Sequence, residues 1–213
     1  MTADRTIVLA GATSEAGLAA ATALIEAGAR VITTGRSEER LAALRDAGAQ
    51  TEIADATSFA EMTWLAEKLG AVDAVIPLVG GWRGGGGLAG QSDEDFDALL
   101  PALHAVRATS RAFDAAIRAS DAGRFAIVSS TVVTRPLAGG ANYAAMKAAS
   151  EAWTRGVAQG YAKAARDAGT ELRAASVIFR AEGGLQAAAL ARAVVTLWDR
   201  DASALNDTVV TLG

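Results

Sequence analysis

The chain has 213 residues, a length that suits one α/β domain with its own core, and we treat residues 1–213 as a single domain. Its net charge of -4 argues against a nucleic-acid partner, because such proteins need clustered Lys and Arg to displace phosphate counterions. The absence of cysteine and the single histidine exclude a disulfide scaffold, a thiolate nucleophile and a multi-histidine zinc site, so we expect no metal. No apolar stretch is long enough to cross a membrane, which predicts a cytoplasmic protein without a membrane partner.

Short apolar runs alternate with longer amphipathic segments along the whole chain, which is typical of βαβ units and a parallel sheet. We predict seven strands, at residues 6–10, 30–34, 50–54, 73–79, 124–129, 171–178 and 208–212. Helices are expected to begin near Glu15, Glu38, Phe59, Ser92, Asn142 and Leu185. Ser37, Ser58 and Ser92 are typical N-cap residues, because a serine hydroxyl accepts a hydrogen bond from the first helical turn. The sequence therefore predicts a doubly wound α/β fold with a seven-stranded parallel sheet and helices on both faces.

A turn of small residues, Gly11 to Gly17, lies between the first predicted strand and the first helix. Such a turn presents backbone N–H groups and a helix N-terminus to a pyrophosphate, which the hydrogen bonds and the helix dipole both stabilise. Gly11 would permit the tight turn, and Gly17 would permit close packing of the helix. We therefore expect a dinucleotide here, with Thr13, Ser14 and Glu15 also beside it.

The second predicted strand ends in Thr34-Gly35-Arg36. A dinucleotide domain that selects NAD usually places an acid here for the ribose 2′-hydroxyl, whereas an arginine accommodates the 2′-phosphate of NADP. Arg36 therefore favours NADP(H), with NAD(H) still possible. The alternative is an exposed arginine that only caps a turn.

A glycine-rich stretch, residues 80–87, follows the fourth predicted strand and contains Trp82 and Arg83. By composition it could be a flexible surface loop. In a doubly wound sheet, however, ligands bind at the carboxyl ends of the strands near the switch in strand order, where this loop lies. We expect it to line the site, with Gly80 and Gly81 beside the cofactor.

Tyr143 and Lys147 are four positions apart on a predicted helix and so share one face. A free phenol has a pKa of about 10, and a neighbouring cation can lower that pKa by roughly 1 to 3 units. Tyr143 could then donate a proton near neutral pH. The fifth predicted strand ends at Ser129-Ser130, where Ser130 could hold a substrate carbonyl oxygen, although two serines after a strand are commonly just a turn or cap.

Together these segments resemble the short-chain dehydrogenase/reductase family in order and spacing over nearly the whole chain. The matching segments are 11–17, 34–36, 53–57, 128–130, 143–147 and 208–213. The resemblance implies a three-layer Rossmann fold and hydride transfer between NAD(P)H and a small carbonyl substrate. It implies further that Tyr143 is the general acid and that Ser130 orients the carbonyl. Lys147 would hold the nicotinamide ribose and lower the pKa of Tyr143, and Asp55 and Ala56 would lie at the adenine.

Several positions depart from the family pattern. Glu15 stands where the family has its middle glycine, so its carboxylate must point away from the phosphates. The helix asparagine of the proton relay is missing, because Ala102-Leu103-His104 occupies that region. Phe179-Arg180 replaces the usual Pro-Gly, and so few residues follow before the last helix that the substrate lid is almost absent.

The stretch Gly80-Gly81-Trp82-Arg83-Gly84-Gly85 is similar to a loop of quinonoid dihydropteridine reductases, in which case Trp82 could stack on a ring substrate. Arg83 and Arg180 could pair with an acidic substrate or be solvated loop charges. Besides an NADPH-preferring carbonyl reductase, two alternatives stay open: a dihydropteridine-reductase-like enzyme and a non-catalytic NADP(H)-binding regulatory module. The resemblance also implies a homodimer or homotetramer that pairs through the long helices after the fourth and fifth strands.

Overall fold

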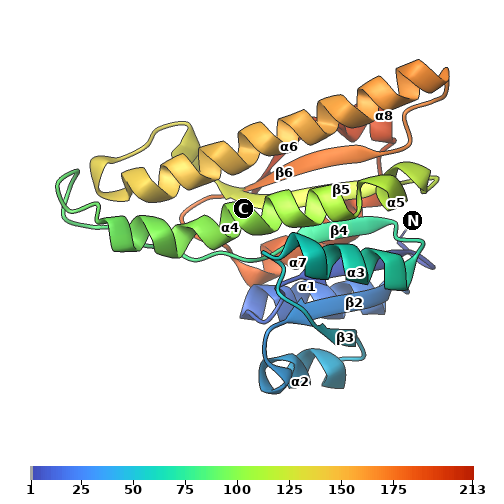
Figure 1. The fold of residues 1–213 in the computed structure, drawn as a ribbon, viewed down its shortest axis with the longest axis horizontal. Coiled ribbons are helices and arrows are strands. Elements are labelled where there is room, and N and C mark those ends of the chain that lie inside the picture. Colours follow the sequence, from blue (N-terminus) through green and yellow to red (C-terminus); the bar gives the residue numbers. More distant parts are fainter. Residues whose placement is uncertain (1) are drawn as a thin grey trace.

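The computed structural model describes residues 2–213, which form a parallel sheet covered by helices on both faces (Figure 1). The strands are β1 (Thr6–Ala10), β2 (Arg30–Gly35), β3 (Gln50–Ile53), β4 (Ala74–Pro77), β5 (Arg124–Ser130), β6 (Ala175–Ala181) and β7 (Thr208–Leu212). Their order in the sheet is β3-β2-β1-β4-β5-β6-β7, so the chain winds outward from β1 and then crosses to β4. The predicted doubly wound, seven-stranded sheet is confirmed.

Eight α-helices and three short 3-10 helices lie among the described residues. The α-helices are α1 (Glu15–Glu26), α2 (Glu38–Asp46), α3 (Phe59–Leu69), α4 (Asp93–Ala112), α5 (Asp114–Ala119), α6 (Ala141–Ala168), α7 (Ala187–Val195) and α8 (Ala202–Leu205). The 3-10 helices are η1 (Thr131–Val133), η2 (Ala138–Gly140) and η3 (Thr196–Trp198). None of the helices within residues 2–213 has the length and apolar character needed to cross a bilayer.

Alternate side chains of the interior strand β1 enter two separate cores, as the pleat of a strand requires. Ile7 and Leu9 pack with apolar residues of α1, α2 and α7. Val8 and Ala10 pack on the other side, with residues of α3, α4 and α6. Because both faces of the sheet are covered, its inner strands β1, β4, β5 and β6 are buried along nearly their whole length rather than at alternate positions.

Two strands have a boundary that differs by more than one residue from the sequence prediction. The apolar pattern predicts a strand at residues 171–178, but β6 begins at Ala175, where it first pairs with Arg124 of β5. Gly169 ends α6 in a left-handed conformation, and residues 170–174 are needed to carry the chain back to the sheet. Similarly, β4 ends at Pro77 because the chain turns there into the glycine-rich loop.

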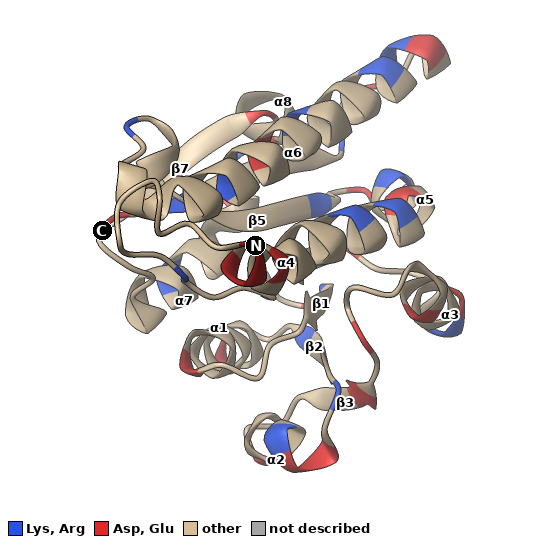
Figure 2. Cartoon of the chain, turned by 60° about the vertical axis from the view of Figure 1, so that its left-hand side comes forward, with Lys and Arg blue, Asp and Glu red and all other residues tan. Residues whose placement is uncertain are grey.

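The helix starts follow local chemistry closely. The hydroxyls of Ser37, Ser58 and Ser92 each accept a hydrogen bond from the N–H three residues later, so all three predicted N-caps are confirmed. Three acidic residues fill the first turn of α4, the red turn in Figure 2, where negative charge complements the helix dipole. The helices α5 and α8 were not predicted, because segments this short carry too little periodicity to read.

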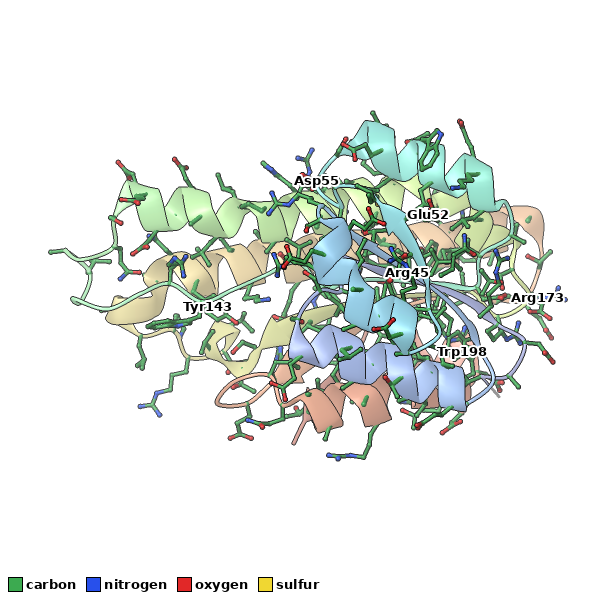
Figure 3. The ribbon with its side chains drawn as sticks, turned by 90° about the horizontal axis from the view of Figure 1, so that it is seen from below. Arg45, Glu52, Asp55, Tyr143, Arg173 and Trp198 are labelled. Carbon is green, nitrogen blue, oxygen red and sulfur yellow. The ribbon has the colours of Figure 1, made fainter. Side chains whose placement is uncertain are left out.

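The long helices α4 and α6 pack against each other on one face of the sheet (Figure 1). Both begin at the end of the molecule where the loop after β4 and the segment after β5 lie. In Figure 3, Tyr143 lies at this end, whereas Arg173 and Trp198 lie at the opposite end. The carboxyl ends of the parallel strands therefore meet the beginnings of both long helices.

Candidate active site

The turn between β1 and α1 is held in place by contacts that leave no room for side chains. A Cβ atom on Gly11, whose φ is +73°, would lie 2.4 Å from Cγ2 of Val79. A Cβ atom on Gly17 would lie 2.1 Å from the carbonyl oxygen of Ala12. The Gly11 N–H also donates to Oγ1 of Thr34 at the end of β2, over 3.0 Å. The turn therefore brings the N-terminus of α1 close to the edge of the sheet.

A cavity of about 580 Å³, here called the cofactor cavity, opens beside this turn. It lies between the ends of β1, β2 and β3 and the residues after β4. Among the residues predicted to bind a cofactor, Gly11, Thr13, Ser14, Arg36, Asp55, Ala56 and Gly80 line it. Arg40, in the first turn of α2, lines it too and was missed, although its position four residues after Arg36 could have indicated it.

The Asp55 carboxylate is engaged locally. Its Oδ1 accepts hydrogen bonds from the backbone N–H and the hydroxyl of Thr57, over 2.9 and 2.8 Å. The backbone N–H of Asp55 donates to Oε2 of Glu61 over 2.8 Å. These bonds shape the turn after β3, so that Asp55 and its neighbour Ala56 form part of the cavity wall.

A second cavity of about 910 Å³, here called the catalytic cavity, adjoins the first and shares with it Ser14 and residues 78–80. Ser130, Tyr143 and Lys147 all line it, so the three predicted catalytic side chains converge on one space. Glu15 and Gly81 also line this cavity and not the cofactor cavity. Glu15 therefore lies on the side of the catalytic cavity and not beside the cofactor cavity.

Lys147 extends from α6 to the end of β5, where its ammonium Nζ donates to the carbonyl oxygen of Val128 over 2.8 Å. Burial lowers the pKa of Lys147 to about 8, and the nearby carboxylate of Glu151 opposes this effect. Nζ lies 5.6 Å from the centre of the Tyr143 ring. The lysine therefore approaches the tyrosine as its spacing on the helix predicts.

The pKa of Tyr143 moves in the direction opposite to the sequence expectation. Burial raises this pKa above its ordinary value, and a hydrogen bond with Ser130 lowers it only in part. The expected lowering by Lys147 does not dominate, because the phenol is removed from water while the ammonium is bound to Val128. Tyr143 is consequently protonated at neutral pH, the form that a proton donor needs.

The structure separates the three residues that were considered for substrate binding. Trp82 lines the catalytic cavity with an exposed fraction of 62%. Arg83 lies outside the cavity lining and approaches Asp95 of α4 at 3.8 Å. Arg180 also lies outside that lining, because its guanidinium is bound by Glu151. The sequence could not show this, because Arg180 and Glu151 lie on different elements.

The first three residues of the glycine-rich stretch, 80–82, line the catalytic cavity, and hydrogen bonds hold its later residues in place. The side-chain Nε2 of Gln91 donates to the carbonyl oxygens of Gly85, Gly87 and Gly139, over 3.0 to 3.2 Å. Its Oε1 accepts from the backbone N–H of Asn142 over 3.1 Å. Gln91 thus links the loop to the start of α6, one residue before Tyr143, a role that its sequence context did not reveal.

The opposite wall of the catalytic cavity is the short connection between β6 and α7. Residues 183–187 line the cavity, and only residues 182–186 join the two elements. The substrate lid is therefore as small as the sequence predicts. His104 is exposed on α4 and lines neither cavity.

Comparisons with known proteins identify the family and agree with the fold. A family model described as short chain dehydrogenase matches residues 5–165. A chain classed as a short chain dehydrogenase from Shigella flexneri 2a str. 301, complexed with NADP, has a TM-score of 0.84 at 21% identity, covering 99% of this chain and 97% of that one. Levodione reductase gives 0.84 at 20% identity, with 99% and 96% covered, and NAD+-bound xylitol dehydrogenase gives 0.84 at 15%, with 99% and 98%. A search of curated proteins finds no match.

Proposed function

The chain belongs to the short-chain dehydrogenase family, and on that basis we propose that it is an NADPH-preferring reductase of a small carbonyl substrate. The observation that carries the proposal is the convergence of Ser130, Tyr143 and Lys147 on the catalytic cavity. That cavity adjoins a second one with a lining suited to a dinucleotide. A proton donor, a hydroxyl and a buried cation therefore lie where a redox cofactor would meet its substrate.

The residues around the cofactor cavity suit an NADP-type dinucleotide. The first turn of α1 offers free N–H groups and the positive end of the helix dipole to a pyrophosphate. Arg36 and Arg40 bring two guanidinium groups to the end of β2, which supports a 2′-phosphate at that position. When bound, the nicotinamide of such a cofactor supplies the hydride. One structural neighbour is complexed with NADP and another is NAD+-bound, so the proposed preference rests on the two arginines.

The catalytic side chains have complementary roles in this proposal. Tyr143 donates a proton to the carbonyl oxygen of the substrate, and its raised pKa keeps the phenol protonated until that step. Ser130, hydrogen-bonded to Tyr143, holds the same oxygen. Lys147 donates one of its three ammonium N–H groups to the carbonyl oxygen of Val128, which leaves two that can donate to a ribose hydroxyl.

A dihydropteridine-reductase-like activity is the second candidate, and Trp82 is the observation that favours it. The indole lines the same cavity as Tyr143 and is largely exposed. A flat aromatic face beside a proton donor suits a planar ring substrate. Reduction of a quinonoid dihydropterin in preference to simple ketones would distinguish this candidate from the first.

The proposal is tested by following NADPH consumption with cyclic ketones, linear ketones and a quinonoid dihydropterin, in the parent protein and in Tyr143→Phe. We expect the variant to bind NADPH like the parent and to turn over about 10²- to 10⁴-fold more slowly. Equal turnover in the two proteins would remove Tyr143 from the mechanism. Tight NADPH binding without turnover of any substrate would favour the non-catalytic regulatory module.

We also propose that the protein is a homo-oligomer formed through α4 and α6. A largely apolar groove of about 1030 Å³ lies between these helices and includes Leu103, Trp153 and Val157. Ala152 and Gly156 have little or no side chain, so the helices of a second copy could approach this part of the groove closely. A solution mass that stays at 21.6 kDa over the micromolar concentration range would contradict this assembly.

A further inference from the structure

Helix α6 contacts the end of β5 through three side chains spaced one turn apart. Tyr143, Lys147 and Glu151 follow one another at intervals of four residues and therefore share one face of the helix. They face three successive residues of β5: Val128 accepts from Lys147, Ser129 donates to Glu151, and the Ser130 hydroxyl acts on the pKa of Tyr143. Two of these side chains belong to the proposed mechanism, and the third has no role in it so far.

Glu151 is buried and accepts hydrogen bonds at both carboxylate oxygens, although the proposed mechanism gives it no role. Only 5% of the residue is exposed, yet all its carboxylate contacts are made with hydrogen-bond donors. Its Oε1 accepts from the Ser129 hydroxyl over 2.7 Å and from Nε of Arg180 over 2.8 Å. Its Oε2 accepts from an Nη of Arg180 over 2.6 Å, which completes a bidentate pair.

The partner residues fix where this carboxylate lies. Arg180 of β6 and Ser129 of β5 are direct neighbours in the register of the parallel sheet. The ion pair with Arg180 therefore links α6 to β6, and the Ser129 hydrogen bond links α6 to β5, both at the carboxyl ends of these strands. Burial acts to raise the pKa of Glu151, but the bonds from Arg180 and Ser129 outweigh burial and hold the pKa below its usual range.

We propose that Glu151, clamped by Arg180 and Ser129, is a positioning residue that keeps the neighbouring Lys147 charged and directed at the end of β5. The carboxylate lies one helical turn from Lys147 and stays ionised because Arg180 and Ser129 donate hydrogen bonds to it. The significance for catalysis rests on the proposed function, whereas the effect on Lys147 can be measured without any substrate.

Other charges near Lys147 do not replace this carboxylate. On α6 itself the other ionisable neighbours on this face are Tyr143, which is neutral at physiological pH, and Arg155, whose positive charge cannot replace a carboxylate. The end of β5 offers only uncharged residues, and β6 offers Arg180, already paired with Glu151. From α1, Glu15 lines the same cavity but is exposed to solvent, and Arg155 acts on Glu151 from the next turn of α6.

The same helix contains a second lysine–acid pair with this spacing, which provides a matched control. Lys163 and Asp167 form an exposed ion pair, with side-chain exposures of 59% and 63%. Glu151 and Arg180, in contrast, have side-chain exposures of 7% and 18%. Solvent screens the exposed pair, so its loss should have no consequence at the active site.

The experiment is a pH titration of lysine side chains by NMR, after selective isotope labelling of lysine. The chain has only three lysines, Lys68, Lys147 and Lys163, so each signal can be assigned by substitution. In the parent we expect Lys147 to titrate near pH 8. In Glu151→Gln, which keeps the side-chain size but removes its charge, we expect the Lys147 midpoint about one pH unit lower. Asp167→Asn should leave that midpoint unchanged.

A second variant guards against a folding defect. Glu151→Gln leaves Arg180 buried without its partner, so the double variant Glu151→Gln/Arg180→Gln removes both charges together. We expect its Lys147 midpoint to be lowered too, because Glu151 is the charge that acts on this lysine. A Lys147 midpoint equal to that of the parent in either folded variant would overturn the inference.

A parallel NADPH titration separates this inference from the proposed function. If the Lys147 midpoint moves as expected but the parent binds no NADPH, the clamp is supported and the reductase proposal fails. If the parent binds NADPH and the midpoint does not move, the reductase proposal survives and the clamp fails.

Discussion

The cofactor cavity and the catalytic cavity share one edge of the sheet but use glycine for different reasons. On the cofactor side, a Cβ on Gly11, Gly17 or Gly35 would lie 2.4, 2.1 or 2.7 Å from a neighbouring atom. On the catalytic side, Gly81 has nothing within 4 Å of a Cβ and no positive φ, whereas Gly183 and Gly184 have φ values of +64° and +125° with open space around them. Glycine is therefore needed on the cofactor side because neighbouring atoms are close, and on the catalytic side only where the backbone takes a positive φ.

The difference shows what determines the shape of the cofactor cavity and of the catalytic cavity. The cofactor side is shaped by backbone in close contact, so one added methyl group must displace the chain. The catalytic side is shaped by side chains that reach in from helices and loops, such as Tyr143, Trp82 and the Gln91 bridge. We therefore expect the cofactor side to be intolerant of an added methyl group at Gly11, Gly17 and Gly35, and the catalytic side to tolerate one at Gly81.

The largest effect expected from this comparison is that of Gly17→Ala. The new methyl group would meet the Ala12 carbonyl at 2.1 Å, so the start of α1 must move away from the turn. We expect the free energy of unfolding to fall by about 1–3 kcal/mol and NADPH affinity to fall at least about tenfold. Chemical denaturation and a fluorescence titration measure the two quantities.

Gly81→Ala is the matched control for that variant, because it adds the same methyl group at the same edge of the sheet. We expect its unfolding free energy to stay within about 0.5 kcal/mol of the parent, with NADPH affinity unchanged. Equal losses in both variants would show that the steric distinction between the two halves does not hold.

A smaller effect is expected from Arg36→Ala, which leaves the backbone of the cofactor side intact. If the Arg36 guanidinium binds the 2′-phosphate as proposed, its removal should weaken NADPH binding about tenfold and leave NADH binding unchanged. Arg45→Ala is the control, since Arg45 lies on α2 (Figure 3) outside the cavity lining and pairs with Glu38. If both nucleotides weaken equally, Arg36 does not select between them.

The smallest effect is expected from Trp82→Ala on the catalytic side. Loss of the aromatic face should raise KM about three- to tenfold for a ring substrate, with kcat and NADPH affinity unchanged. Trp64→Ala removes a tryptophan of comparable exposure on α3, outside both cavities, and should change none of these quantities. An unchanged KM in Trp82→Ala would exclude stacking on Trp82.

Features that depend on neighbours along the chain were predicted well. The order and type of the seven strands follow from apolar runs, and the starts of α2, α3 and α4 follow from their serine caps. The shared face of Tyr143 and Lys147 follows from helix geometry alone. The beginning of β6 was missed, because pairing with β5, and not apolar character, decides where a strand starts.

Features that depend on contacts between segments distant in sequence could not be predicted. Arg180 was considered for the substrate, but it binds Glu151, 29 residues away in sequence. Gln91 carries no signal in its own context, although it joins the glycine-rich loop to a segment 48 residues further on. The raised pKa of Tyr143 likewise reflects how much water the assembled site excludes.

By itself, the sequence determined the α/β architecture, the positions of the serine caps and the alignment of Tyr143 with Lys147. These depend on local periodicity, local hydrogen bonds and helical spacing, which the chain specifies residue by residue. Only the tertiary structure decided which charges pair and which titrating groups lose water. A long arginine can reach many partners, and which one it binds depends on the burial and direction of groups that other elements bring to the same place.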